Sequence, residues 1–548
     1  MNTKKIVCIL LSFLFILLVA CSNNGTSSDN ANSSSTQIES SPSKKISLLY
    51  SASDSLNPYK AETELNRQIG LLIFDSLVKL DSEFQPQYIL AKSIEISKKE
   101  CTITLKNALF SDGSVVTADD VAFSLKLAQE SKLKYSEQLK TVKSYTVEAT
   151  DTIKLHLTKT DPYFANMLDF PIMKKDSDNL KDENNIILCP TGSGRYVFDN
   201  ETKRLKANNM YILGVPTTSE IELINAPDET VVKYNLEANN VSIYYSPLND
   251  GVIPSMSGKS IPLALNNLIY LGVNLNNSFL KDAKARYAVS AAISRTEICN
   301  DAYYSYATEA VGIFNAAFSD AGSLQNLSKT PDLENVVANL TEIGYNEKND
   351  DGFYISKNNK VLTLKLVTYD GNERRVKTAE LIKQQLESVG IKVNLVSLNW
   401  DDYVTALKER SFDLYLAEVQ LGNNMDVTEL VTSNGKLAYG ILSPTPASPS
   451  TEEDEQLDSS TLENDEQNIN NKPDDKTEYI SSVPLLDNVV SAFYNEELSL
   501  VDIINAFNAE LPIIPVCHRL GITVCDAKLN VDSMSSISDA YFGIMNIK

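Results

Sequence analysis

A single apolar run near the start most constrains how this chain can fold. It extends from Ile6 to Leu18, follows Lys4-Lys5 and leads into Val19-Ala20-Cys21. The run is too short to span a bilayer comfortably, and a charged start, a short apolar segment and a small residue before a cysteine are typical of an export signal. We therefore predict that residues 1–20 are a lipoprotein signal peptide and that Cys21 becomes the lipidated first residue. The alternative is an ordinary cleaved signal, or a membrane anchor, in which Cys21 has no role.

No second long apolar run follows, so we expect the rest of the chain to fold in water. Residues 21–43 are mostly Ser, Asn, Thr and Asp, and this composition predicts a flexible tether because it offers almost nothing apolar to bury. The folded part is expected to begin near Lys44. One acyl chain binds a membrane only marginally, so a stable anchor on Cys21 needs two or three acyl chains. These features predict a cell-membrane location, lipid-anchored on the extracytoplasmic face.

The length and charge of the remainder narrow the class of protein. About 500 residues follow the tether, which is more than one hydrophobic core usually serves, so two or three lobes are expected. The 72 acidic and 49 basic residues give a net charge of −23, or −25 once Lys4 and Lys5 are removed with the signal. Such a surface repels nucleic acid and anionic lipid. We therefore predict no nucleic-acid partner.

Cysteine and histidine are too few and too scattered to indicate a metal site or a disulfide framework. Cys8 and Cys21 lie in the signal region, and the remaining cysteines, without CxxC spacing, are Cys101, Cys189, Cys299, Cys517 and Cys525. Scattered thiols are typical of small buried residues, although Cys517 and Cys525 can pair if their strands are neighbours. His156 and His518 are the only histidines, so a histidine-coordinated metal such as nickel or haem iron lacks ligands. We predict no cofactor and no metal.

Local patterns indicate a mixed α/β fold. A strand is expected from Ile46 to Ser51, a helix from Glu64 to Leu77, and another helix after Thr117, which caps it together with the acidic residues that follow. Residues 362–369, 375–389 and 392–398 have the pattern of a strand, a helix and a strand, a βαβ unit that predicts a parallel sheet. The segment 191–195 lacks the Lys-Ser/Thr ending of a phosphate loop, and we interpret it as a turn that enters a strand.

One segment breaks this pattern. Residues 443–478 contain 11 acidic and two basic residues, and the rest is rich in Ser, Pro and Asn. This composition predicts a disordered or loosely ordered insertion. We interpret it as a solvated insertion, and the alternative is a cation or partner site.

Five separated stretches resemble the solute-binding proteins of ABC importers, in particular family 5, which binds dipeptides, oligopeptides and nickel. In chain order they are 56–59 with 73–78; 110–113 with 116–121; 271–274 with 286–295; 362–414, including 390–393, Trp400 and 412–414; and 511–515. The second stretch is the most specific. In the third, Ser294 stands where the family usually has an aspartate. Together they cover the chain from about Lys45 to its C-terminus in the family's order.

The resemblance implies an α/β fold like that of type II periplasmic-binding proteins, with two main lobes joined by hinge strands and a small inserted third lobe. The lobes are expected to comprise 44–80, 186–267 and 506–548 (lobe I), 81–185 (lobe II) and 268–505 (lobe III). The hinge strands are expected near 268–274 and 510–516. In such a fold, a ligand shifts an equilibrium between open and closed forms by its additional affinity for the closed form.

The resemblance also implies a ligand site between the lobes. The candidate ligand-binding residues are Glu62, Glu64, Tyr270, Arg374, Trp400, Glu418, Gln420, Gly422, Asn423, Asn424 and Asp426. Trp400, the only tryptophan, matches a pocket aromatic of the family, and the alternative for it is core packing. Arg374 is placed to pair with a ligand carboxylate. Glu62 and Glu64 follow the Pro-containing turn, where the family's peptide binders carry an acidic residue, and the alternative for them is solvation.

The loop after residues 412–414 departs from the family's pattern. Peptide-binding relatives carry an aspartate there that pairs with the peptide's α-amino group, whereas this chain has Gly422. Asp426 can replace it only if the loop shifts, which puts recognition of free peptides in doubt. Alternation along the strand from Leu414 places Glu418 and Gln420 on one face.

These observations favour a binding protein over an enzyme. The sequence has no nucleophile elbow, no HExxH and no serine with a plausible histidine partner, which argues against an extracellular hydrolase. We predict a monomeric lipoprotein, anchored to the membrane through Cys21, that delivers a peptide or another small polar solute to the permease and ATPase of an ABC importer. The alternatives are a sensor or adhesin that binds without transport, and an extracellular hydrolase.

Overall fold

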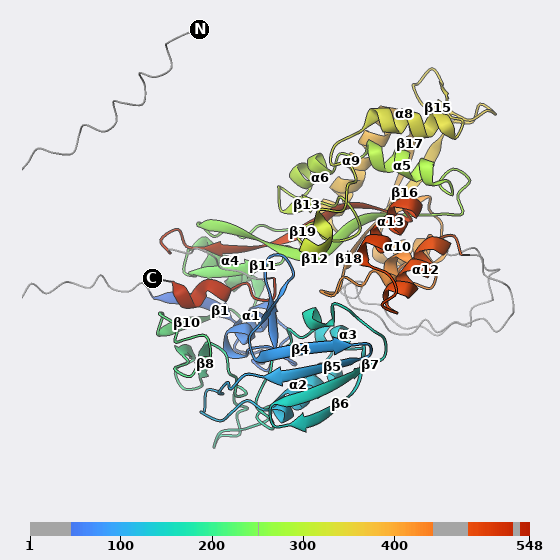
Figure 1. The fold of residues 1–548 in the computed structure, drawn as a ribbon. Helices are drawn as coiled ribbons and strands as arrows, with labels where there is room; N and C mark the ends of the chain where they lie inside the picture. Colours follow the sequence, from blue (N-terminus) through green and yellow to red (C-terminus); the bar gives the residue numbers. More distant parts are fainter. Residues whose placement is uncertain (1–44, 250, 442–480, 530–536, 548) are drawn as a thin grey trace, which may run out of the picture. The chain divides into compact units, whose positions relative to one another are not determined.

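The computed structural model describes residues 45–249, 251–441, 481–529 and 537–547, all within one compact unit, Lys45–Lys548. The predicted signal peptide, Cys21, the tether and the acidic insertion at 443–478 lie outside the described residues. In the described ranges, no helix combines the length and the apolar character that crossing a membrane requires. The fold is mixed α/β, as the sequence predicts (Figure 1).

The N-terminal strand enters a four-stranded sheet. β1 (Ile46–Tyr50) pairs in parallel with β10 (Glu220–Asn225), and β9 (Arg204–Ala207) and β8 (Tyr196–Asp199) complete the sheet. α1 (Glu64–Ile73) begins after Thr63, whose hydroxyl accepts a backbone N–H of the first turn. The helix ends earlier than predicted, because Phe74 is already extended.

Two glycines account for the end of α1. Gly194 donates its N–H to the carbonyl oxygen of Ile73 at 2.8 Å. A Cβ at Gly194 would lie 2.5 Å from the Ile73 carbonyl carbon, and one at Gly192 would lie 2.1 Å from its oxygen. Only glycine permits this approach. The turn predicted at 191–195 therefore packs against the C-terminal end of α1 and places Arg195 directly before β8.

A second four-stranded sheet is antiparallel, in the order β4-β5-β7-β6. Its strands are β4 (Ala91–Ser97), β5 (Glu100–Leu105), β6 (Val142–Ala149) and β7 (Thr152–Leu157), followed by the short 3-10 helix η1 (Phe164–Met167). α2 (Ala118–Glu130) packs against β6 and β7, and α3 (Lys134–Gln138) follows it (Figure 1). The predicted cap of α2 is confirmed, because Thr117 and Asp120 form a reciprocal capping box.

The third sheet is the largest, with seven strands in the order β11-β19-β12-β18-β16-β17 and β13 paired with β19. The bounds are β11 (Ile243–Ser246), β12 (Lys259–Val273), β13 (Ala307–Glu309), β16 (Thr363–Tyr369), β17 (Lys392–Leu398), β18 (Leu414–Gln420) and β19 (Ile513–Cys525). β16, α9 (Glu373–Val389) and β17 form the predicted βαβ unit, since β16 and β17 are parallel. Gly390 ends α9 with a φ of 103°, a conformation that favours glycine.

Helices pack with this sheet into one apolar cluster. They are α5 (Ala283–Ala292), α6 (Arg295–Asp301), α8 (Leu333–Glu342), α10 (Trp400–Lys408), α12 (Pro484–Phe493) and α13 (Leu500–Glu510). Smaller elements are α4 (Glu229–Glu237), α7 (Ser319–Gly322), α11 (Thr428–Val431), η3 (Phe542–Asn546), and the strand pairs β2 (Val78–Leu80) with β3 (Pro86–Tyr88) and β14 (Glu347–Lys348) with β15 (Tyr354–Ile355). A second cluster joins the cores of the two four-stranded sheets.

β12 and β19 are the longest strands among the described residues, with 15 and 13 residues. They pair with each other over most of their length, with Tyr270 opposite Pro515 and Gly272 opposite Ile513 (Figure 1). The segments predicted as hinge strands fall mainly within these two strands. Their role as hinges and the predicted lobe boundaries stay predictions.

The sequence allowed a disulfide between Cys517 and Cys525 if they were on neighbouring strands, and this possibility is wrong. Both residues lie on β19, so their Cα atoms are ~26 Å apart at ~3.3 Å per strand residue, whereas bridged cysteines lie within ~7 Å. All of the cysteines in the described ranges are free.

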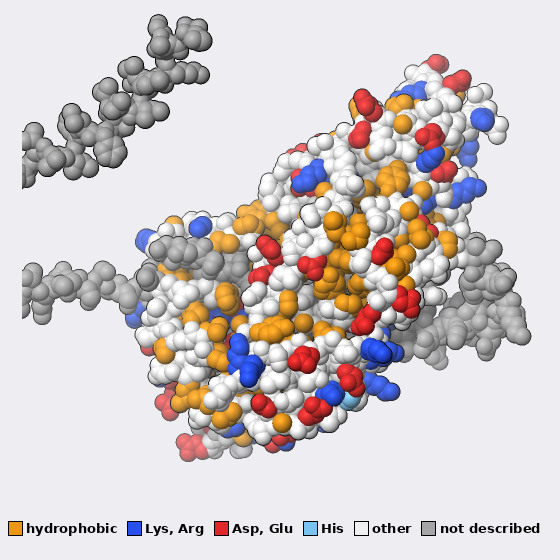
Figure 2. All heavy atoms as spheres, viewed as in Figure 1, with side chains coloured by type: hydrophobic (Ala, Val, Ile, Leu, Met, Phe, Trp, Pro, Cys, Tyr) orange, Lys and Arg blue, Asp and Glu red, His pale blue; other side chains and the backbone are white. Residues whose placement is uncertain are grey.

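Charges of both signs share the molecular surface. Figure 2 shows Lys and Arg side chains intermixed with Asp and Glu over the visible face. Exposed ion pairs include Arg204 with Glu220 and Lys284 with Glu342. Because exposed pairs contribute only ~0–1 kcal/mol each, the ionic interactions that matter for this fold are the buried ones around the candidate site.

Candidate ligand-binding site

A cavity of about 470 Å³ lies where several separate segments of the chain meet. The walls are formed by α1, residues 132–141 around α3, residues 245–249 at the end of β11 and beyond it, residues 263–267 of β12, residues 419–430 at the end of β18 and beyond it, and the C-terminal residues 537–540. Small-molecule sites usually measure ~300–1,000 Å³, so this cavity suits a small solute. Its charged lining residues are Glu64, Glu137, Asp169, Asp426, Glu429 and Asp539 together with Arg67, Lys132, Lys134 and Lys140. The cavity therefore presents both signs of charge.

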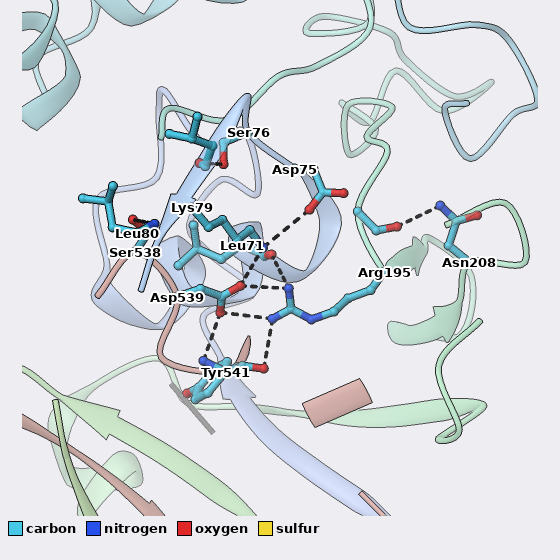
Figure 3. Close-up of polar contacts among 12 residues, drawn as sticks. Leu71, Asp75, Ser76, Lys79, Leu80, Arg195, Asn208, Ser538, Asp539 and Tyr541 are labelled. Carbon is cyan, nitrogen blue, oxygen red and sulfur yellow. Dashed lines mark hydrogen bonds and ion pairs between the residues drawn. The ribbon is translucent and has the colours of Figure 1, made fainter. Parts of the chain in front are cut away.

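A buried ionic network holds the C-terminal residues 537–540 in the cavity wall (Figure 3). Arg195 donates hydrogen bonds to both carboxylate oxygens of Asp539, at 2.8 and 3.0 Å, and to the carbonyl oxygen of Tyr541 at 3.0 Å. Lys79 donates to Asp539 at 2.8 Å and lies 3.5 Å from Asp75. The side chains of Arg195 and Asp539 are fully buried. Residues from the start, the middle and the end of the described chain thus meet in one network.

The two carboxyl groups of this network ionise differently. Burial by itself would raise the pKa of Asp539, but the charges of Arg195 and Lys79 lower it to about 2. Burial raises the pKa of Asp75, and the opposing charges of Lys79 and Arg195 do not fully offset it. Neither oxygen of Asp75 accepts a hydrogen bond from a described residue. Asp539 is therefore the charged partner that Arg195 requires.

Residues 159–169 contact the loop at 422–426 and fix it. Asp161 accepts a hydrogen bond from the side-chain amide of Asn424 at 2.6 Å, and Lys159 forms an ion pair with Asp426. Burial raises the pKa of Asp161 to about 6, with the charge of Asp426 as a further cause. Burial alone would also raise the pKa of Asp426, but the charge of Lys159 lowers it. Asp426 is therefore ionised, and Lys159 already neutralises it.

The side chain of Asn424 limits the space at the first position of this loop. A Cβ at Gly422 would lie 2.6 Å from the Asn424 side-chain oxygen. The Gly422 carbonyl oxygen accepts a hydrogen bond from Asn266 on β12 at 2.9 Å, and Asn166 donates to the Asn423 carbonyl oxygen at 3.0 Å. The loop is held from both sides by neutral hydrogen bonds.

A second buried ionic cluster supports another part of the wall. Glu418 on β18 pairs with Arg375 of α9 at 3.2 Å and with Arg519 of β19, and it accepts a hydrogen bond from Asn267 at 3.0 Å. Burial by itself would raise the pKa of Glu418, but the two arginine charges lower it. Arg519 also donates to the carbonyl oxygen of Pro247 at 2.7 Å. The cluster thus positions Asn267 and Pro247, which line the cavity.

The structure brings some of the candidate residues together at the cavity and leaves the others outside its wall. Those that line it are Glu64, Gln420, Gly422, Asn423, Asn424 and Asp426. Glu64 is the first residue of α1, and its carboxylate binds Arg67 at 3.0 Å and Gln68 at 2.7 Å. Its charge is thus partly satisfied within the helix.

The remaining candidates lie in other surroundings. Glu62 is exposed before α1, and Tyr270 is buried in the core with its ring against Tyr415. Trp400 packs edge-to-face on Tyr369 at 5.2 Å, which fits its core-packing alternative. Arg374 is buried in α9 and donates to the carbonyl oxygen of Gly251. The ligand contacts proposed for Glu62, Tyr270, Trp400, Arg374 and Glu418 stay predictions.

Sequence reasoning missed several cavity residues. They are Arg67, Gln68, Lys134, Asp169, Asn266 and the C-terminal Ser538 and Asp539. None belongs to a motif. Arg67 and Gln68 lie three and four residues after Glu64 on α1, so helical spacing places them beside it, whereas the others reach the cavity through tertiary packing. The glycine-containing turn at 191–195, which ends at Arg195, was the local signal nearest to this region.

The family of this chain follows from comparison with known proteins. A model of the bacterial extracellular solute-binding proteins, family 5 (middle), matches residues 84–439. The chain belongs to this family, whose members serve ABC importers. The resemblance drawn from the sequence motifs is thereby confirmed.

Individual relatives agree with this assignment. The oligopeptide-binding protein AppA of Bacillus subtilis (strain 168) is 24% identical over 452 residues, which cover 75% of this chain and 80% of AppA. The glutathione-binding protein GsiB of Escherichia coli (strain K12) is 24% identical over 361 residues, covering 63% and 67%. Among solved structures, a nickel ABC transporter protein of Bacillus halodurans aligns with a TM-score of 0.70 at 18% identity, covering 92% of this chain and all of that one (100%). The fold is that of the type II periplasmic-binding proteins, and the chain is a binding protein, not an enzyme.

Proposed function

We propose that this protein captures a short peptide, or a closely related small zwitterionic solute, and delivers it to an ABC importer from a lipid anchor on the extracytoplasmic face of the membrane. The observation that carries the proposal is the cavity of about 470 Å³ with acidic and basic side chains in its walls. A peptide has an ammonium and a carboxylate group, and each needs an opposite charge or hydrogen bonds once it leaves water. Two relatives are named as binding proteins for oligopeptides and for glutathione, and these names support the same ligand class.

Nickel is a poorer candidate, although the structural neighbours include a nickel ABC transporter protein of Bacillus halodurans and NikZ of Campylobacter jejuni in complex with Ni(L-His). His156 lies on β7 and His518 is buried in β19, and neither lines the cavity. Across the described ranges, no group of three or more His, Cys, Asp or Glu is arranged to hold a metal ion. A soft or imidazole-preferring metal would therefore lack its usual ligands in this cavity.

A thermal-shift screen tests the ligand class. The purified chain is heated with di- to pentapeptides, single amino acids and sugars, each in large excess. Because a ligand that binds only the folded state stabilises it by mass action, we expect a peptide at about a hundred times its dissociation constant to add about 2.7 kcal/mol. A response to a sugar, with none to any peptide, would reject the peptide proposal.

The lipid anchor is tested separately with Cys21→Ala. The wild-type chain is expected to enter the detergent phase of a detergent-partitioning assay, whereas the variant cannot carry acyl chains on residue 21 and is expected to stay in the aqueous phase. Unchanged partitioning of the variant would contradict lipidation of Cys21 without affecting the ligand assignment.

A further inference from the structure

Two thiols from distant parts of the chain lie next to each other between α6 and β19. Cys299 of α6 is 4% exposed and Cys517 of β19 is fully buried. α6 packs against both β13 and β19 (Figure 1). The hydroxyl of Thr296 donates to the carboxylate of Glu309 on β13 at 2.9 Å, and Glu309 pairs with Cys517 in the sheet. Because Cys299 lies three residues after Thr296, helical spacing places it on the side of α6 that meets this part of the sheet.

A buried cation lies beside both thiols. Arg295, the first residue of α6, is 0% exposed. Its Nε donates to the carbonyl oxygen of Pro515 at 2.9 Å, two residues before Cys517, and its other hydrogen bonds go to two carbonyl oxygens and a serine hydroxyl. These partners are all neutral, and no carboxylate among the described residues forms an ion pair with Arg295.

The charge of Arg295 favours a thiolate at this position. Burial lowers the pKa of Arg295 to about 10, and the neighbouring Cys517 and Cys299 oppose this shift. Arg295 therefore stays protonated at neutral pH. A buried cation is costly without an anion nearby, and a thiolate is the anion that these neighbours can supply.

The two thiols also influence each other. Burial raises the pKa of Cys517, and the neighbouring Cys299 raises it further. Since two adjacent thiolates repel each other in the interior, the pair carries at most one negative charge. One thiolate beside one thiol is the combination that forms a disulfide by exchange with an external disulfide.

We infer that Cys299 and Cys517 form a site of reversible disulfide formation, for which a disulfide compound is the oxidant. Cys299, as a thiolate, attacks one sulfur of the oxidant, and the other sulfur leaves as a thiolate. Cys517 then loses its proton and attacks the Cys299 sulfur of the mixed disulfide, which releases the second sulfur of the oxidant. One S–S bond forms as one breaks, and the oxidant takes up two electrons and two protons to become two thiols.

The bond would join segments that are far apart in the chain. It ties α6 to β19 and closes the loop between residues 299 and 517, which constrains the unfolded chain. Disulfides persist outside the cytoplasm, where conditions are oxidising. Because both thiols are buried, the oxidant reaches them while the chain folds or when α6 opens locally.

The test uses the full purified chain in detergent and hydroxyethyl disulfide as the oxidant. The chain is incubated with it in the native state and, separately, during refolding from urea, with dithiothreitol in place of the oxidant as the reduced reference. Remaining thiols are alkylated, and peptide mass spectrometry without reduction identifies linked cysteines. Wild type is compared with Cys299→Ser and with Cys101→Ser. Cys101 is a matched control, because it is also fully buried, on β5, and burial alone raises its pKa.

We expect wild type and Cys101→Ser to yield a peptide pair that links Cys299 to Cys517, with the loss of two thiols per chain, which dithiothreitol restores. Their oxidised forms are expected to unfold at a higher urea concentration than their reduced forms, because the closed loop constrains the unfolded chain. Cys299→Ser is expected to lack the linked peptides and to have the same urea midpoint with and without the oxidant.

Two results would overturn the inference. The first is the absence of a peptide pair linking Cys299 to Cys517 in oxidised wild type, a result that does not depend on whether any variant folds. The second is an oxidant-dependent rise of the urea midpoint that Cys299→Ser retains. Peptide binding by the reduced chain tests the proposed function separately, so each of the two proposals can fail while the other stands.

Discussion

Arg195→Met is expected to lower the free energy of unfolding by about 3–5 kcal/mol, the usual cost of removing one partner from a buried ion pair. Arg195 is fully buried, and it supplies two of the hydrogen bonds that Asp539 accepts. Without it, Lys79 alone faces two buried carboxyl groups, and the carbonyl of Tyr541 keeps only the backbone N–H of Ile544 as a donor. Urea denaturation followed by circular dichroism measures the loss.

Arg204→Met is the matched control for this experiment. Arg204 also pairs with a carboxylate in the same sheet region, but its side chain and that of Glu220 are 37% and 40% exposed, so its loss is expected to cost below ~1 kcal/mol.

The losses of stability in Arg195→Met and Arg204→Met should also differ in their pH dependence. The folded-state pKa of Asp539 is about 2, below its ordinary value of 3.8, so its ionic contribution is complete above pH ~4 and disappears as the pH falls towards 2. The loss of unfolding free energy in Arg195→Met, relative to wild type, should therefore become smaller as the pH falls over that interval. Equal losses for Arg195→Met and Arg204→Met would contradict the network.

Glu418→Gln is expected to cost a similar amount, again about 3–5 kcal/mol. Its carboxylate is the common partner of Arg375 and Arg519, whose side chains are 13% and 4% exposed. A glutamine leaves both cations buried without a negative charge. The measurement is the free energy of unfolding without any ligand, because a residue whose only role is ligand contact would leave that quantity nearly unchanged.

Glu342→Gln provides the control for Glu418. Glu342 pairs with Lys284, but both side chains are exposed, at 57% and 50%, so its replacement should change stability by less than ~1 kcal/mol. A loss for Glu418→Gln no larger than this would show that the cluster is not structural.

The elements that the sequence predicted well are those whose signals are local. Thr117 and Asp120 cap α2, and the strand–helix–strand pattern that Gly390 punctuates appears as β16, α9 and β17. The end of α1 was misjudged, because Ile73 stops the helix through contacts with Gly192 and Gly194, which are far away in the chain. No pattern within the helix could report that contact.

The same distinction between local and long-range signals applies to the residues of the candidate site. The loop at 422–426 could be found from the family motif that precedes it, and it does line the cavity. Asp169, Asn266 and Asp539 could not be found, because each reaches the cavity through packing between distant segments, such as the hydrogen bond from Ser538 to Asp169. Trp400 and Arg374 are residue types common in binding sites, yet here they pack against Tyr369 and the Gly251 carbonyl, respectively.

The central claim is that this chain binds a peptide reversibly in one cavity and leaves it chemically unchanged. Isothermal titration calorimetry of the full purified chain in detergent, with the best peptide of the thermal-shift screen, tests it most directly. We expect saturable binding of one peptide per chain, with the intact peptide recovered afterwards by mass spectrometry. No saturable binding of any di- to pentapeptide, or recovery of a cleaved peptide, would contradict the account.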